Sequence, residues 1–119
     1  MRIAVKRVYQ EPARADGQRV LVDRLWPRGL ARSSAHLDHW MKDVVPSNGL
    51  RKWFAHDPVK WSEFQKRYRA ELAKSAEQLA ALKRLARECG TLTLLYGARD
   101  EAHNQAVVLA AVLKGRSSA

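Results

Sequence analysis

The segment Thr91–Tyr96 (TLTLLY) constrains the fold of this chain more than any other part of the sequence. Leucine, threonine and tyrosine fill it without a charged residue, which predicts a buried strand. Gly97 ends the segment, and an apolar helical pattern then runs from Glu101 to about Lys114. Helical patterns also precede the segment. A buried strand between helices predicts a largely parallel sheet that helices cover.

Two earlier segments also predict strands. Residues 3–9 (IAVKRVY) are rich in β-branched residues, and residues 19–23 (RVLVD) are apolar enough for a central strand. Because parallel crossovers usually need about a dozen residues, the short link between them fits either a tight crossover or an antiparallel hairpin. The expected fold class is therefore α/β: a small, mostly parallel sheet of about three or more strands, covered by helices, in a single layered domain over residues 1–119.

The segment before Pro46 is predicted to contain a short helix. Its apolar residues recur at helical spacing; they are Leu37, Trp40, Met41 and Val44. A proline disfavours helical backbone in the residue before it, so this helix is expected to end before Pro46. Ser47 is then expected to cap the next helical turn.

Two longer helices are predicted from the residues that begin them. Asp57 followed by Pro58 is a favourable helix start, because aspartate caps free backbone N–H groups and proline fits the first turn. Ser75 with Gln78 three residues later forms a capping-box pattern, which predicts a second helix start. The apolar face of the first helix consists of Trp61, Phe64, Tyr68 and Leu72.

The end of the second helix and the start of the last one are also marked. Gly90 suits a helix C-terminus, and Cys89 before it lies on the predicted apolar face, so we expect this thiol to be buried and inert. Asp100 is expected to cap the last helix. Because Cys89 is the chain's one cysteine, an internal disulfide is excluded.

The net charge of +10 and the isoelectric point near 10.4 favour anionic partners, either phosphorylated small molecules or nucleic acid. The cations are spread along the chain without a basic tail. No apolar run approaches the ~20 residues that span a bilayer, and the N-terminus becomes charged again after three apolar residues. A cytoplasmic location with no signal peptide is expected. The sequence leaves the oligomeric state open.

Residues suited to chemistry follow two of the predicted strands. Ligands of parallel α/β sheets bind outside the carboxyl ends of the strands. If these two strands are parallel, the two groups of residues face each other across one crevice. The groups are Asp23, Arg24 and Arg28 at and after the end of residues 19–23, and Tyr96, Asp100, His103 and Asn104 at and after the last strand.

An anionic, phosphate-bearing small molecule is the expected ligand of this crevice. Arg24, Arg28 and Arg51 are candidates to hold its charge, because guanidinium groups bind phosphate through two hydrogen bonds at once. Asp23 and His103 are the candidate catalytic pair for acid–base work. Tyr96, Asp100 and Asn104 would complete the binding set.

Structural roles compete with these functional ones. Asp23 and Arg24 are equally suited to a plain ion pair, and Asp100 to a helix cap alone. The sequence does not decide between binding and catalysis.

Other classes of function leave weaker signals. His36 and His39 have a spacing that suits a shared metal ion, but two isolated histidines are more often ordinary surface residues. On that ground no metal is expected, and because no glycine-rich phosphate loop occurs, no cofactor is expected either. The absence of a nucleophile elbow leaves a serine nucleophile without support. The alternative function is a nucleic-acid-binding module, in which Arg51, Lys52 and Trp53 would grip phosphates and stack on a base.

Several long motifs resemble one bacterial family. They are RVLVDRLWPRG at 19–29, LRKWF at 50–54, HDP at 56–58, TLLYGARDE at 93–101 and HNQ at 103–105. These motifs resemble the YeaO-like branch of a bacterial domain-of-unknown-function family over nearly the whole chain. The resemblance supports Asp23, Arg24 and His103 as site residues. It implies no particular activity, and it implies no thiol chemistry because Tyr96 stands near the position of a cysteine in more distant relatives.

Overall fold

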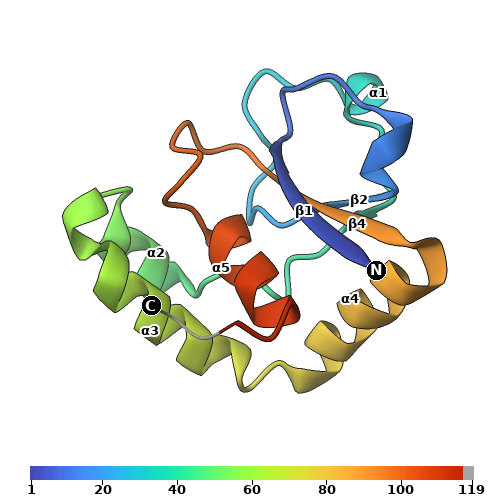
Figure 1. The fold of residues 1–119 in the computed structure, drawn as a ribbon. Coiled ribbons are helices and arrows are strands. Elements are labelled where there is room, and N and C mark those ends of the chain that lie inside the picture. The colour runs from blue at the N-terminus through green and yellow to red at the C-terminus, as the bar shows by residue number, and fades with distance from the viewer. Residues whose placement is uncertain (117–119) are drawn as a thin grey trace.

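The computed structural model describes residues 1–116 and contains one sheet of four strands. The strands are β1 (Arg2–Arg7), β2 (Gln18–Leu21), β3 (His39–Trp40) and β4 (Thr91–Tyr96). Every pairing is parallel, and the order across the sheet is β1-β4-β2-β3. The expected α/β class is confirmed, with β4 at the centre beside β1 (Figure 1).

The first two strands do not pair with each other. Both pair in parallel with β4, so that Val5 of β1 and Val20 of β2 lie opposite Leu94 on either side. The link between them contains a short 3-10 helix, η1 (Arg14–Asp16). The sequence allowed this link to be either a parallel crossover or an antiparallel hairpin. The central position of β4 excludes the hairpin.

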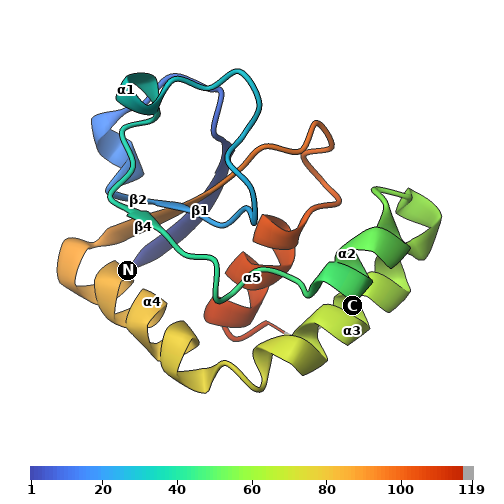
Figure 2. The same ribbon diagram turned by 180° about the vertical axis from the view of Figure 1, so that it is seen from behind.

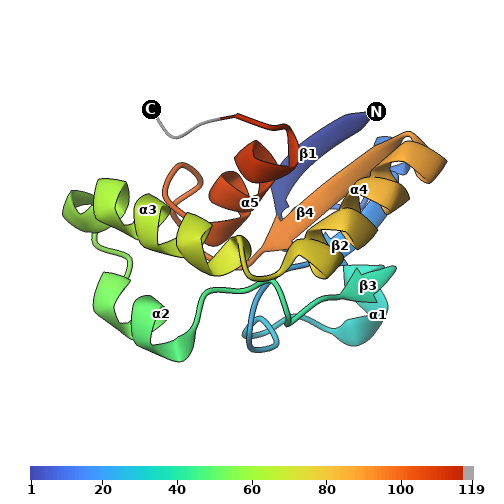
Figure 3. The same cartoon turned by 90° about the horizontal axis from the view of Figure 1, so that it is seen from below.

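Residues 1–116 contain five α-helices: α1 (Arg32–Ala35), α2 (Asn48–Phe54), α3 (Trp61–Leu72), α4 (Ala76–Cys89) and α5 (Gln105–Leu113), with a 3-10 turn η2 (Pro58–Lys60) before α3. Helices α4 and α5 cover one face of the sheet, and α3 packs against α5 (Figure 3). None of the helices in residues 1–116 is long and apolar enough to cross a membrane.

Successive residues of the central strands point to opposite faces, as the pleat of a strand requires. Leu94 belongs to the main core under the helices, while its neighbour Leu95 belongs to a smaller cluster on the other face. That smaller cluster also contains Val8 and Leu21. Side chains from the segment after β2 cover it: Trp26, Leu30, Leu37 and Trp40.

The predicted helix before Pro46 is wrong. Residues 39–40 instead form the edge strand β3, which extends the sheet beside β2. The backbone N–H of Met41 donates to the carbonyl of Leu21, and Trp40 packs on the smaller apolar cluster. Helical spacing of the apolar residues therefore reflected contacts made on two sides of an extended segment. This segment continues from the sheet to α2 (Figure 2).

Two of the predicted caps are confirmed. The Ser47 hydroxyl accepts the N–H of Leu50 at the start of α2, and the Asp57 carboxylate accepts the N–H of Val59 at the start of η2. Ser75 does stand before α4, but its side chain makes no capping hydrogen bond.

Two expectations about the later helices are wrong. Helix α5 begins at Gln105 rather than at residue 101, and its cap is Asn104, whose side-chain oxygen accepts the N–H of Val107. Asp100 instead closes the turn before it. Cys89 is exposed: it is the last residue of α4, and the buried residues of that helix are Leu82 and Ala86.

Candidate functional site

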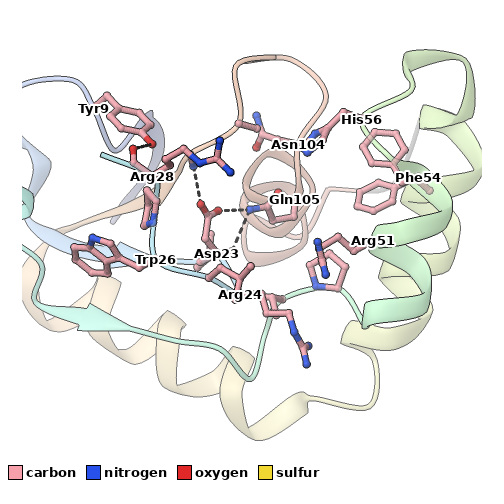
Figure 4. Close-up of a pocket in the computed structure, with 18 residues that line it drawn as sticks. Tyr9, Asp23, Arg24, Trp26, Arg28, Arg51, Phe54, His56, Asn104 and Gln105 are labelled. Carbon is pink, nitrogen blue, oxygen red and sulfur yellow. Dashed lines mark hydrogen bonds between the residues drawn. The ribbon is translucent and has the colours of Figure 1, made fainter. Parts of the chain in front are cut away.

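A pocket of about 340 Å³ lies at the carboxyl ends of β2 and β4. Its walls come from the end of β2, the loop 24–28, α2, α3, the residues after β4 and the first turn of α5 (Figure 4). Because β2 and β4 are parallel neighbours, the two groups of residues that follow them meet at this edge. This is the place where parallel α/β sheets bind ligands.

Asp23 stands at the junction of the two strand ends. One carboxylate oxygen accepts the backbone N–H of Gly97 at 2.9 Å, and the other accepts the side-chain amide of Gln105 at 2.6 Å. Burial raises the pKa of Asp23 to about 6, although these two hydrogen bonds and the charge of His56 act to lower it. The pocket therefore contains a desolvated carboxylate that titrates close to neutral pH.

The loop after β2 is held by hydrogen bonds to its backbone. The hydroxyl of Tyr9 donates to the carbonyl of Arg28 at 2.6 Å, and the indole of Trp26 donates to the carbonyl of Leu30 at 2.7 Å. The indole of Trp40 donates to the carbonyl of Asp23 at 2.7 Å. These bonds use the main chain and leave the arginine side chains of the loop available for a ligand.

Three predicted anchors, Arg24, Arg28 and Arg51, all line the pocket. Within residues 1–116 no ion pair joins any of them to an acid, so the alternative of an Asp23–Arg24 bridge is not what the structure contains. The guanidinium of Arg51 donates to the side chain of Asn48 at 3.1 Å. The pocket thus combines three exposed cations with one half-buried acid.

Aromatic side chains form the apolar part of the wall. Phe54 and Phe64 are buried and stack with their ring centres 4.2 Å apart. His56 joins the lining from a segment in which Ala55 and His56 both have left-handed backbone, with φ of 45° and 56°. Such backbone is costly for residues other than glycine and is concentrated at functional sites.

Three of the predicted site residues do not reach the pocket wall. Tyr96 is buried in the main core, and that burial raises the pKa of its hydroxyl. Asp100 and His103 pair with each other at 2.9 Å in the turn before α5, where the His103 ring also meets Trp61 edge-on. The hydrogen bond from His103, with those from the backbone of Ala102 and His103, lowers the pKa of Asp100.

Asn104 does line the pocket, but its side chain is occupied. Its oxygen caps α5, and its nitrogen donates to the carbonyl of Asp100. The structure therefore brings Asp23, Asn104 and the three arginines together. It separates His103 from the pocket lining. The predicted catalytic partnership of Asp23 and His103 has no shared contact in the described residues.

Sequence reasoning missed Gln105 and His56 as pocket residues. Gln105 became visible only once α5 was seen to begin there, because a helix starting at residue 101 gives this residue no special position. The available signal for that start was Asn104, a favourable helix cap, with an unbroken apolar run from residue 106 to residue 113 after Gln105. His56 belongs to the HDP motif at 56–58, but its place in the pocket depends on the left-handed turn after α2, which no local pattern predicts.

The segment proposed for nucleic-acid binding is partly engaged within the protein. The ring of Trp53 is half-buried against the main core and faces the guanidinium of Arg67 at 4.3 Å. The ammonium of Lys60 lies 5.2 Å from the same ring. Intramolecular cation–π contacts of this kind leave less of the ring for stacking on a base.

Comparison with known proteins identifies the family. A sequence model described as "Inactive DUF488-N3 subclade" matches residues 2–119. The chain belongs to this subclade. The protein named "Uncharacterized protein YeaO" of Escherichia coli K12 is 44% identical over 110 residues, which cover 92% of this chain and 95% of that protein. "Uncharacterized protein Rv3073c" of Mycobacterium tuberculosis H37Rv is 44% identical over 115 residues, covering 97% and 96%.

These relatives confirm the YeaO-like membership that the motifs predicted. "Uncharacterized protein Mb3100c" of Mycobacterium bovis shows the same identity of 44% over 115 residues. No solved structure matches this chain.

Proposed function

We propose that this YeaO-like protein binds a phosphate-bearing small molecule in the pocket at the ends of β2 and β4. The observation that carries the proposal is the set of three arginines around one cavity, none of them paired with an acid in residues 1–116. Guanidinium groups that line one cavity without an acidic partner supply the hydrogen bonds that a phosphate or carboxylate takes up. The net charge of +10 would also attract such a ligand.

Binding without turnover is the form of the proposal that the observations favour. Asp23 lines the pocket, but His103, the partner that the sequence suggested, pairs with Asp100 outside its lining. The lining does contain His56, but within residues 1–116 no hydrogen bond joins it to Asp23. The description of the subclade as inactive agrees with this choice. Asp23 would then contact the ligand as a hydrogen-bond acceptor.

Isothermal titration of the protein with ribose 5-phosphate tests the proposal. Arg28→Ala should weaken binding at least about tenfold, because a hydrogen bond to a charged group contributes roughly 1.5–3 kcal/mol. The matched control is Arg84→Ala on the exposed surface of α4, which should bind like the unaltered protein. Equal affinity in the Arg28 variant, or an equal loss in both variants, would contradict the proposed site.

Nucleic-acid binding, the alternative function, would give a different result in the same assay. A short oligonucleotide would bind with an affinity that falls steeply with salt, since phosphate contacts release counterions. Lys52→Ala would weaken this binding, and Arg28→Ala would affect it no more than Arg84→Ala does. This outcome would replace the small-molecule proposal.

A further inference from the structure

We propose that the ligand of this pocket is a guanine mononucleotide, with its base held by Asp23 and its phosphate by the arginines. This inference rests on the proposed function and names the ligand within it. Three features of the pocket support this inference: hydrogen-bond acceptors at its inner end, apolar rings along its wall, and exposed arginine side chains.

The inner end of the pocket presents acceptors rather than donors. The amide nitrogen of Gln105 already donates to the carbonyl of Val22 at 3.1 Å and to Asp23 at 2.6 Å, so its two hydrogens are used. Each oxygen of Asp23 takes one hydrogen bond from the protein, while a carboxylate has about four acceptor positions. A ligand group at this end must therefore donate hydrogen bonds to Asp23.

Guanine fits that requirement better than the other common bases. A carboxylate has two oxygens side by side, and guanine offers two parallel donors, its ring N1–H and its 2-amino group. Adenine and cytosine place an acceptor ring nitrogen beside their amino group, and that nitrogen would face a carboxylate oxygen unfavourably. Hypoxanthine keeps the N1–H but lacks the amino group, so it would make one of the two bonds.

The remainder of the pocket suits the rest of a nucleotide. Phe54 and Phe64 provide a buried apolar wall, and flat rings pack well on such surfaces. Arg24 and Arg28 are exposed, where a phosphate can reach them from solvent. The volume of about 340 Å³ is on the scale of one mononucleotide rather than of an oligonucleotide.

The test compares four mononucleotides by isothermal titration: the monophosphates of guanosine, inosine, adenosine and xanthosine. The unaltered protein should bind guanosine monophosphate at least about tenfold more tightly than the other three. Asp23→Asn should reverse the preference toward xanthosine monophosphate, because an amide donates to the 2-oxo group where the carboxylate accepted from the 2-amino group. Asp43→Asn, at an exposed position outside the pocket, is the matched control and should retain the preference for guanine.

The outcomes separate this inference from the proposed function. Equal binding of all four nucleotides and of ribose 5-phosphate, lost in Arg28→Ala, would overturn the guanine assignment and support anion binding. Absence of binding by every phosphate would overturn both. If Asp23→Asn proves unfolded by circular dichroism, the preference of the unaltered protein among the four nucleotides decides the matter.

Discussion

Two carboxylates at opposite ends of β2 have opposite environments. Asp16, just before the strand, pairs with Arg19 and with Lys6, at 3.1 Å for the lysine. Burial alone would raise the pKa of Asp16, but the N–H of Ala13 and the two cations lower it below its ordinary value. Asp23, just after the strand, has no cation bonded to it within residues 1–116, and burial raises its pKa to about 6.

The difference separates a structural charge from an available one. At the start of β2, Asp16 and Arg19 satisfy each other, and Arg19 also donates to the carbonyls of Ala35 and His36. At the end of β2, neutral amides hold Asp23 while the arginines of the same pocket remain free of acids in the described part of the chain. A carboxylate kept apart from nearby cations is the arrangement expected of a binding site.

Removing the buried cation should produce the largest effect. Arg19→Ala removes the ion pair to the buried Asp16 and leaves two backbone carbonyls without their hydrogen-bond donor. We therefore expect the free energy of unfolding to fall by about 3–5 kcal/mol. Urea denaturation, followed by circular dichroism, measures this change in the free energy of unfolding. Arg24→Ala, the matched change at the other end of the strand, should cost less than about 0.5 kcal/mol. Similar losses in both variants would remove the distinction between the two ends.

The pH dependence of stability should show the two acids in separate ranges. The raised pKa of Asp23 means that the folded protein binds its proton more tightly than the unfolded chain does. The free energy of unfolding should therefore increase as the pH falls from above 6 to about 4. The expected increase is about 3 kcal/mol, because the pKa of Asp23 rises from 3.8 in the unfolded chain to about 6 in the folded protein. The lowered pKa of Asp16 acts oppositely: its contribution is present above 3.8 and is lost below that value.

Thermal denaturation between pH 3 and pH 8 measures this profile. Asp23→Asn should abolish the rise between pH 6 and pH 4 and keep the loss at lower pH, because the amide does not titrate. Asp43→Asn, an exposed aspartate, should leave the whole profile unchanged. A rise that survives in the Asp23 variant would assign the titration to another group.

The sequence predicted the parts of the fold that are written in local patterns. β4 was predicted with its observed bounds, and the caps Ser47 and Asp57 were correct, because composition and capping chemistry act over a few residues. The edge strand β3 was missed, since two residues that pair with β2 leave no periodic pattern. Its existence depends on contacts between segments far apart in the chain.

The site was predicted as far as the ends of β2 and β4 could place it. Asp23 and the three arginines were expected to meet, and the structure brings them to one pocket. His103 was expected there too, but a helix that begins at Gln105 leaves it in the preceding turn, paired with Asp100. The helix begins four residues later than expected, so the residues just before it are not helical and their side chains point elsewhere than the prediction assumed.

The smallest of the expected effects concerns Gly97, whose N–H holds Asp23. A Cβ at this position would lie 2.8 Å from the Asp23 carboxylate oxygen and 3.5 Å from Cβ of Pro27, so Gly97→Ala must displace the carboxylate. We expect a loss of about 1 kcal/mol in unfolding free energy, the contribution of the hydrogen bond, together with loss of nucleotide binding.

The same substitution at Gly49 should have the opposite sign. A Cβ there meets open space within α2, where alanine stabilises a helix by about 0.5–1 kcal/mol relative to glycine. Urea denaturation and nucleotide titration of both variants make the comparison. If Gly97→Ala is as stable as Gly49→Ala and still binds nucleotide, the carboxylate of Asp23 does not depend on its bond to Gly97. The region after β2 would then tolerate an added methyl group better than the region before it, where a Cβ added at Gly17 would lie 2.3 Å from the carbonyl oxygen of Thr91.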